Sequence, residues 1–253
     1  MLKHLGDKRT NEHNIKLASS LGFIAGFVNA AGFLGFSVLT TNVTGHAALF
    51  AERIALEDWR TAGVVAIWMF LFLAGAFFSG LIVERVGRNR RFSYVIPIIL
   101  EIFILLGVAL EGFKYNGLEG AKELFAGSLL FSMGMQNALV SMVSGSVVRT
   151  THLTGTFTDL GIELARAFQK GDTNREVLHA RINLRLVIIF FFMGGALAGA
   201  WLFRFLHFSA FFVPASILGF TLAYDIFRIR LKRWYTQSRS GSPIRHGRRP
   251  PRT

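Results

Sequence analysis

The sequence predicts an all-α membrane protein with six transmembrane helices, arranged as two inverted-topology three-helix repeats. Each repeat has a short re-entrant or interfacial helix after its first span. Long apolar runs, uneven positive charge and similarity between the two halves predict this fold. The chain has 253 residues, of which 52% are hydrophobic and 26 are Phe, and its mean hydropathy is +0.44. Soluble domains of this length seldom have such a composition.

Six segments are apolar enough to cross a bilayer, which takes about 20 mostly apolar residues. They are approximately Leu17–Leu39, Thr61–Val83, Ser93–Leu110, Leu124–Val148, Leu186–Phe205 and Phe208–Phe227. The first run is too long for a signal-peptide core, so we read it as a retained span. The predicted order is an N-terminal segment, a first repeat, an external loop, a second repeat and a basic tail, at residues 1–16, 17–111, 112–123, 124–230 and 231–253.

Positive charge sets the orientation of the spans, because Lys and Arg concentrate in cytoplasmic connections. The basic connections are Glu84–Arg91, Arg166–Arg185 and the C-terminal tail. Six spans with both termini in the cytoplasm place all three of these connections on the cytoplasmic side. We therefore predict that both termini are cytoplasmic.

The tail from Arg228 to Thr253 carries nine Lys or Arg and no Asp or Glu. Its Arg-, Ser-, Gly- and Pro-rich composition predicts disorder. We expect it to contact anionic lipid headgroups. Nucleic acid is the less favoured partner, because charge alone is weak support for nucleic-acid binding.

Internal similarity between the halves is the strongest pattern in the sequence. The stretch SLGFIAGFVNA, which begins at Ser20, and SLLFSMGMQNA, which begins at Ser128, are identical at six of eleven positions. The later stretches TTNVTGHAALF and TTHLTGTFTDL match, as do GAFFSG and GALAGA. Since each half has three spans, the second half enters the membrane from the opposite side. Many secondary transporters share this plan and bind substrate where the halves meet.

Polar residues inside the spans are the first candidates for a substrate-binding site. Asn29 and Asn137 occupy matching positions, and Gln136 precedes the second of them. An amide in hydrocarbon needs a hydrogen-bond partner. An interhelical hydrogen bond and a contact to a solute explain these side chains equally well.

The two threonine-rich turns supply the next candidates, which are Thr41, Thr44, Gly45, His46, Thr151, Thr154 and Gly155. Thr44 and Thr154 could cap short helices over Gly45–Leu56 and Gly155–Phe168 with their hydroxyls. A helix start of this kind suits an anion or a carbonyl, although capping alone is the preferred interpretation.

The histidines and acids near these turns have simpler interpretations. His46 and His152 lack the spacing of a metal site, so we expect neither a metal nor a cofactor. Asp159 and Glu163 lie on one helical face, where we expect a solvated pair balanced by Arg166.

Glu101 lies about halfway along the third predicted span, with apolar residues on both sides. An ionised carboxylate at that depth costs on the order of 2.5–3.5 kcal/mol or more. Protonation or a buried partner would remove this cost. A neutral acid that bonds between helices is one interpretation; a cavity-facing carboxyl that couples solute movement to protons is the other.

The order of an early G-x-x-N-A span, a T-x-x-T-G turn, GMQNA and then TTHLTGT resembles the YoaK family of bacterial membrane proteins. The resemblance covers roughly residues 17–230. It implies a small multi-span protein of the bacterial inner membrane, with no established substrate or reaction. Where many relatives have Asn in the first turn, this chain has His46.

A transporter or channel-like protein for a small polar solute is the leading functional hypothesis. A membrane-embedded scaffold or accessory subunit is the alternative, and a lipid-modifying enzyme is less favoured. We expect no enzymatic activity, because the acids are scattered and the chain has no cysteine. Self-association into a homo-oligomer is left open by the sequence.

Cysteine-accessibility mapping tests the predicted topology in a chain without native cysteine. Asn89→Cys and Ser240→Cys variants should react with a membrane-impermeant thiol reagent only from the cytoplasmic side, because both positions lie in basic segments. Labelling of either variant from the periplasm would contradict the topology.

Overall fold

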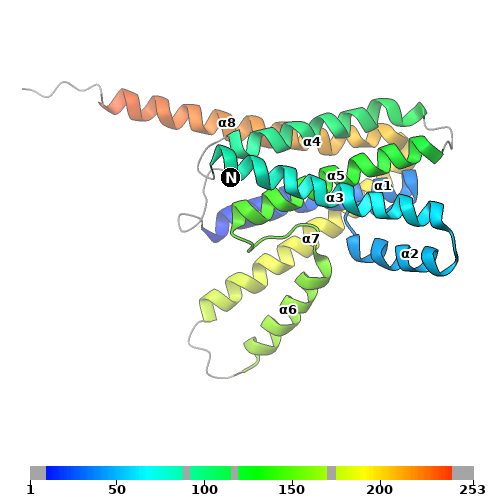
Figure 1. The fold of residues 1–253 in the computed structure, drawn as a ribbon. Coiled ribbons are helices and arrows are strands. Elements are labelled where there is room, and N and C mark those ends of the chain that lie inside the picture. The colour runs from blue at the N-terminus through cyan, green and yellow to red at the C-terminus, as the bar shows by residue number, and fades with distance from the viewer. Residues whose placement is uncertain (1–9, 88–91, 115–118, 170–174, 241–253) are drawn as a thin grey trace, which may run out of the picture.

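The computed structural model describes residues 10–87, 92–114, 119–169 and 175–240, and no strand occurs within them. Long helices form a bundle, and two shorter helices lie beside it (Figure 1). The helices are α1 (Asn11–Phe36), α2 (Val43–Ala55), α3 (Trp59–Val86), α4 (Phe92–Glu111), α5 (Glu119–Ser144), α6 (Leu153–Ala167), α7 (Arg175–Leu206) and α8 (Phe212–Ser240), with the 3₁₀ turns η2 (Gly112–Lys114) and η3 (His207–Phe211).

Five helical stretches of the described residues are long and apolar enough to cross a membrane. The last of them, Arg175–Phe227, runs from α7 through η3 into α8. The outer surface is also apolar, since Phe70, Phe190 and Phe220 are each at least 66% exposed. These features indicate a membrane protein, as the sequence predicts.

The ends of the helices differ from the predicted segment boundaries. Helix α1 already begins in the predicted N-terminal segment, and α5 begins inside the predicted external loop. Helix α8 continues to Ser240, into the segment predicted to be disordered, while residues 241–253 lie outside the described residues. The first predicted span ends early because Ser37 adopts a left-handed conformation with φ of 57°.

The two short helices expected after the first span of each half are α2 and α6. Both begin two residues before the predicted starts at Gly45 and Gly155. Figure 1 shows α2 beside α3 at one end of the bundle, whereas α6 and the first part of α7 extend away from it. Each short helix thus packs against the second long helix of its own half, although only α6 lies away from the bundle.

Helices α1 and α7 approach one another closely enough for backbone atoms to touch. A Cβ atom at Gly26 would lie 2.0 Å from the carbonyl oxygen of Phe192, and one at Gly195 would lie 2.0 Å from that of Phe23. No real side chain tolerates such distances, so glycine is required at both positions. Close approach through small residues is a common way to pack helices in membranes.

Helices α3 and α5 make the same contact with the matching residues. A Cβ at Gly75 would lie 2.0 Å from the carbonyl oxygen of Phe131, and one at Gly134 would lie 2.1 Å from that of Phe72. The first span of each half thus packs against the second span of the other half. The matching GAFFSG and GALAGA segments are therefore helix-packing faces.

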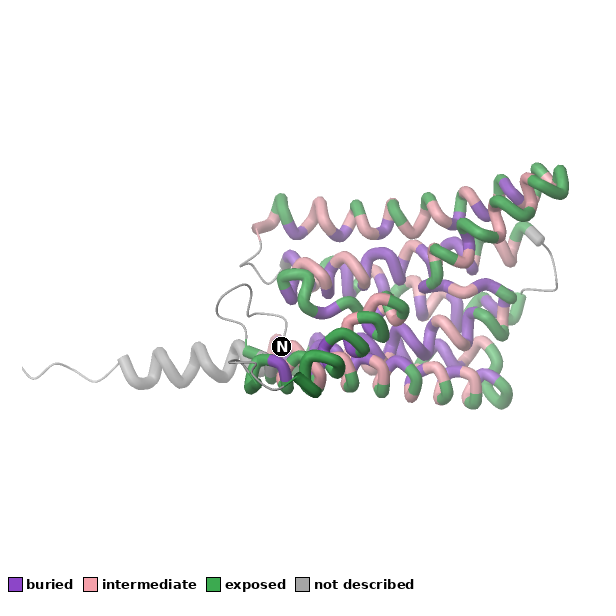
Figure 2. The backbone as a smooth tube through the Cα atoms, turned by 90° about the horizontal axis from the view of Figure 1, so that it is seen from below, coloured by how far each residue is buried: buried purple, intermediate pink, exposed green. Residues whose placement is uncertain are grey.

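Helices α4 and α8 lie together along the opposite side of the bundle from α2 (Figure 1). Buried residues follow the sides of the helices that face the middle of the bundle (Figure 2). Phe27, Phe36 and Phe211 are the largest fully buried side chains and anchor this core.

Adjacent glycines on α7 allow a matched test of the crossing. Gly195→Ala should lower the free energy of unfolding by about 1–3 kcal/mol, because its methyl group collides with a rigid backbone. Gly194→Ala is the control, since its Cβ meets nothing within 4 Å. Thermal unfolding in detergent micelles measures both. Equal melting temperatures for the two variants would contradict the packing described here.

Candidate functional site

The first threonine-rich turn is tied to α1 by a side-chain amide. The Thr41 backbone N–H donates to Oδ1 of Asn29 over 3.1 Å. Asn29 therefore has the structural partner that an amide within a span requires. It holds the segment between α1 and α2 against the helix that precedes it.

The second turn matches the first in sequence but not in hydrogen bonding. Oδ1 of Asn137 is buried and has no hydrogen-bond partner among the described residues. Two additional residues separate this amide from Thr151, so the backbone N–H that Asn29 uses has no equivalent here. The longer turn instead bends at Gly145 and Ser146, both with φ of 64°.

The capping roles predicted for Thr44 and Thr154 are wrong. Both residues lie inside their helices and are exposed. Helix α2 is capped by Asn42, whose Oδ1 accepts from the N–H of Gly45 over 2.9 Å. At α6 the N-cap is His152, which makes no side-chain capping bond. Asn is as good an N-cap residue as Ser and better than Thr, so Asn42, two positions before Thr44, was the better choice.

Thr40 and Thr150 are the buried members of the two turns. Each is fully buried at 0% exposure, and each has an Oγ1 atom without a hydrogen-bond partner among the described residues. The structure thus places a matching pair of uncompensated hydroxyls at the two turns. The sequence reasoning named their neighbours, Thr41 and Thr151, as candidates instead.

The two histidines near the turns differ in environment. His46 is buried against Trp68, with the ring centroids 5.9 Å apart. His152 is exposed. Among the described residues no group of three or more His, Asp or Glu side chains is placed to hold a metal ion.

Gln136 joins α5 to α1 across the middle of the bundle. Its Nε2 atom donates to the carbonyl oxygen of Leu21 over 2.9 Å, while Oε1 has no partner among the described residues. Ser132, one turn earlier on α5, is also fully buried, and the described part of the chain offers its hydroxyl no hydrogen-bond partner. The inner face of α5 therefore carries two polar groups with unused hydrogen-bonding capacity.

Glu101 faces the interior of the bundle and not the lipid. It belongs to the buried stripe of α4, together with Ile98, Leu105 and Val108. Its side chain is 1% exposed, and Oε1 has no hydrogen-bond partner in the described part of the chain. The matching residue of α8 is the buried Leu218. The carboxyl therefore belongs to one half only.

An ionic cluster fastens α6 to α7, and its cation differs from the predicted one. Arg185 lies 3.1 Å from Asp159 and 3.9 Å from the buried carboxylate of Glu163. It also donates to the carbonyl oxygen of Val147 over 3.4 Å. The pairing expected with Arg166 is wrong, because α7 brings a closer guanidinium to the same helical face. Arg185 is the last charge before the apolar run of α7, which was the available signal.

Two cavities lie outside the predicted site residues. The larger, of about 510 Å³, opens between α1, α7 and α8 and is lined by Lys16, Ser19 and several aromatic side chains. The smaller, of about 300 Å³, lies between the starts of α3 and α5 and has charged walls. Neither is lined by the Asn, Gln or Thr candidates.

The family model described as "Protein of unknown function (DUF1275)" matches residues 17–224. The chain belongs to this family. The YoaK family, whose motifs the sequence resembles, is a member of the same group. No curated protein and no solved structure is significantly similar to the chain. Family membership thus supports the resemblance while adding no reaction or substrate.

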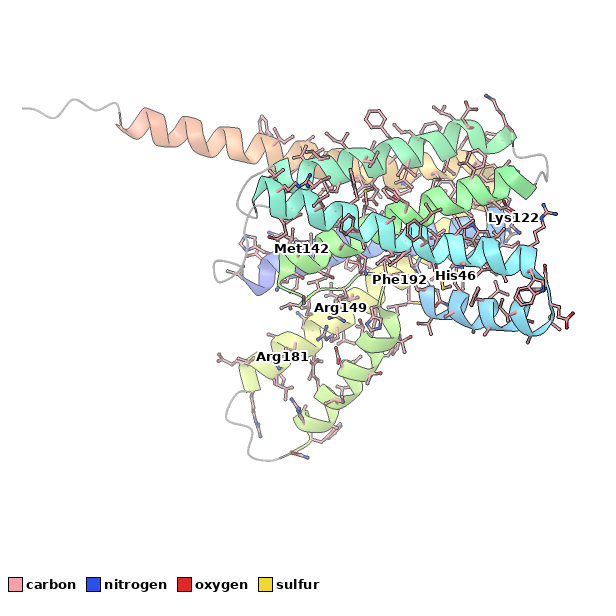
Figure 3. All side chains as sticks on the ribbon, in the orientation of Figure 1. His46, Lys122, Met142, Arg149, Arg181 and Phe192 are labelled. Carbon is pink, nitrogen blue, oxygen red and sulfur yellow. The ribbon has the colours of Figure 1, made fainter. Side chains whose placement is uncertain are left out.

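Replacing Arg185 should loosen α6. Arg185→Gln leaves the buried Glu163 carboxylate without its cation, at a cost on the order of 3 kcal/mol. Faster hydrogen exchange across residues 153–167 is the expected result. Arg181→Gln is the control, because Arg181 is an exposed cation on the same helix (Figure 3). Equal exchange in the two variants would show that the cluster does not hold α6.

Proposed function

We propose that the chain is a small transporter or channel-like protein, in which two inverted three-span halves carry a polar solute through their common interface. The reciprocal glycine crossings are the observation that carries this proposal. Gly26 and Gly195 on one crossing match Gly134 and Gly75 on the other. An inverted repeat produces this exchange of partners, since a pseudo-two-fold axis maps each crossing onto the other.

Buried polar groups near this interface support solute binding. Glu101, Ser132 and Gln136 come from α4 and α5, and each has an atom without a hydrogen-bond partner among the described residues. Thr40 and Thr150 add matching hydroxyls at the two turns. A buried group without a partner costs about 1–3 kcal/mol. A solute or water admitted during a transport cycle would offset that cost.

The arrangement of the helices supports the proposed topology. Helix α1 begins, α3 ends and α8 ends at the same end of the bundle (Figure 1). We propose that this end faces the cytoplasm of a bacterial inner membrane, with both chain termini on that side and the basic tail near anionic lipid. Helices α2 and α6 are then the re-entrant or interfacial elements of the two halves.

Transport is proposed in preference to catalysis because of the kinds of residue that are buried. Amides and hydroxyls predominate near the interface, with Glu101 as an added carboxyl. These groups bind and release polar solutes through hydrogen bonds, whereas hydrolysis or group transfer needs a nucleophile beside a base. We propose that Glu101 gains and loses a proton during the cycle.

Accessibility of Ser132 tests the proposal without knowledge of the substrate. In Ser132→Cys, a thiol replaces a fully buried hydroxyl of similar size. A water-soluble methanethiosulfonate reagent should modify it in membranes, because an alternating cycle exposes the interface to water. Phe70→Cys is the control, since Phe70 lies on the apolar outer surface and should react slowly. A Ser132→Cys variant that stays unmodified at every pH would point to a closed scaffold.

The same assay tests the role of Glu101. We expect the labelling rate of Ser132→Cys to depend on pH, and Glu101→Gln to remove that dependence while labelling continues. Glu111→Gln removes an exposed carboxylate from the end of the same helix and should change nothing. The thiol of Ser132→Cys ionises in both the Glu101 and the Glu101→Gln background. The ratio of the two labelling rates at each pH therefore removes the contribution of thiol ionisation. Identical pH profiles would contradict the proton-coupling role.

A further inference from the structure

The smaller cavity is a groove between the first turns of α3 and α5, at the end of the bundle where Figure 3 labels Lys122. On α3 it is lined by Arg60, Thr61, Val64 and Trp68, which share one helical face. Lys122 and its neighbour Glu123 form the α5 wall, and Asp58, the residue before α3, also lines the groove. Its volume of about 300 Å³ is at the low end for ligand pockets, which suits a small molecule.

The walls carry two positive and two negative groups. Lys122 and Glu123 make no ion pair with the described residues. Asp58 accepts from the backbone N–H of Thr61 over 3.1 Å and lies 3.7 Å from Arg53. Hydrogen bonds from the Thr61 side chain and backbone lower the pKa of Asp58, so it is a carboxylate near neutral pH. The groove therefore offers both signs of charge to a ligand.

Trp68 is the residue of the groove lining that lies farthest along α3. It lies eight residues beyond Arg60, or about 12 Å along the helix. Its side chain is 7% exposed, and its buried Nε1 atom has no hydrogen-bond partner among the described residues. His46 packs against the indole ring. A buried indole N–H without a partner is uncommon and is suited to a ligand oxygen.

We propose that this groove binds a small zwitterionic solute of the amino-acid class. Its carboxylate lies between Lys122 and the indole N–H of Trp68, and its ammonium group faces Glu123, while Arg60 and Asp58 lie nearer the start of α3. Charge-assisted hydrogen bonds of both signs then hold a ligand with no net charge. Transport of this ligand through the interface depends on the proposed function, whereas its binding depends only on the groove.

A lipid headgroup is the other source of paired opposite charges. Phosphatidylethanolamine carries a phosphate and an ammonium group at the membrane surface. The position of Trp68, about 12 Å inward from Arg60, favours a free solute. A headgroup tethered to acyl chains remains near the surface and cannot reach the indole N–H.

Fluorescence of Trp68 measures binding directly. Trp59→Phe, Trp201→Phe and Trp234→Phe together leave Trp68 as the one tryptophan of the four in the chain. In nanodiscs of phosphatidylglycerol, glycine should change the Trp68 emission in a saturable manner. Acetate and methylammonium, each with half of the charge pattern, should give no saturable change at the same concentrations.

Charge-neutral variants test the residues that hold the ligand. Lys122→Gln and Glu123→Gln should each weaken glycine binding about tenfold, because each variant loses one charge-assisted hydrogen bond to the ligand. Lys114→Gln and Glu111→Gln are matched controls, because these residues form an exposed ion pair with each other outside the groove. Unliganded Trp68 emission that is the same in all variants shows that the fold is retained.

Several results would overturn the proposal. Glycine without a saturable response would do so, as would an equal response to acetate or unchanged binding in both Lys122→Gln and Glu123→Gln. Loss of glycine binding when phosphatidylethanolamine is added would identify the occupant as a lipid headgroup. Since this equilibrium assay needs no transport, the Ser132→Cys result separates failure of the binding site from failure of the proposed function.

Discussion

Contact between helix backbones at four glycines is the constraint on which the rest of the structure depends. At Gly26, Gly75, Gly134 and Gly195 a Cβ would overlap a carbonyl group of the neighbouring helix. Each contact joins a first span to the second span of the other half, so neither half could keep this packing alone. In lipid, where apolar burial gives little driving force between helices, such contact is a main source of association. The crossings also fix the rotation of α5, which turns Ser132 and Gln136 inward toward α1.

On this symmetric scaffold the polar groups are distributed unevenly. Glu101 matches Leu218, Gln136 matches Val28, and Arg185 matches Val65. The repeated glycines and threonines therefore maintain packing and turns, while the unmatched polar residues give each half different chemistry. Different polar residues in the two halves suit a protein whose two sides face different compartments. A symmetric site would bind its ligand equally well from both compartments.

Sequence patterns predicted the features that depend on composition and repetition. Apolar runs located the long helices, and the repeat aligned Gly26 with Gly134 and Gly75 with Gly195, the four residues that form the crossings. Prediction failed where a three-dimensional neighbour decides the outcome. Arg185 took the partner role assigned to Arg166, because the packing of α7 beside α6 brings its guanidinium to the same helical face. The groove walls were missed for the same reason: Trp68 and Lys122 are far apart in sequence and meet only where α3 packs against α5. The capping error at Thr44 was local, since Asn42 two residues earlier is the better N-cap residue.

The buried polar atoms that have no hydrogen-bond partner among the described residues limit which states of the protein are stable. Leaving buried groups such as Glu101 Oε1 and Asn137 Oδ1 without partners costs about 1–3 kcal/mol each, unless each is protonated, hydrated or bound. The glycine crossings cannot loosen gradually, because packed backbones have no softer intermediate arrangement. Under the proposed function, the two crossing pairs, α1 with α7 and α3 with α5, move as units, and water or solute reaches these atoms between them. Rigid crossing pairs beside unsatisfied polar groups suit the two discrete arrangements that the proposed alternating access requires.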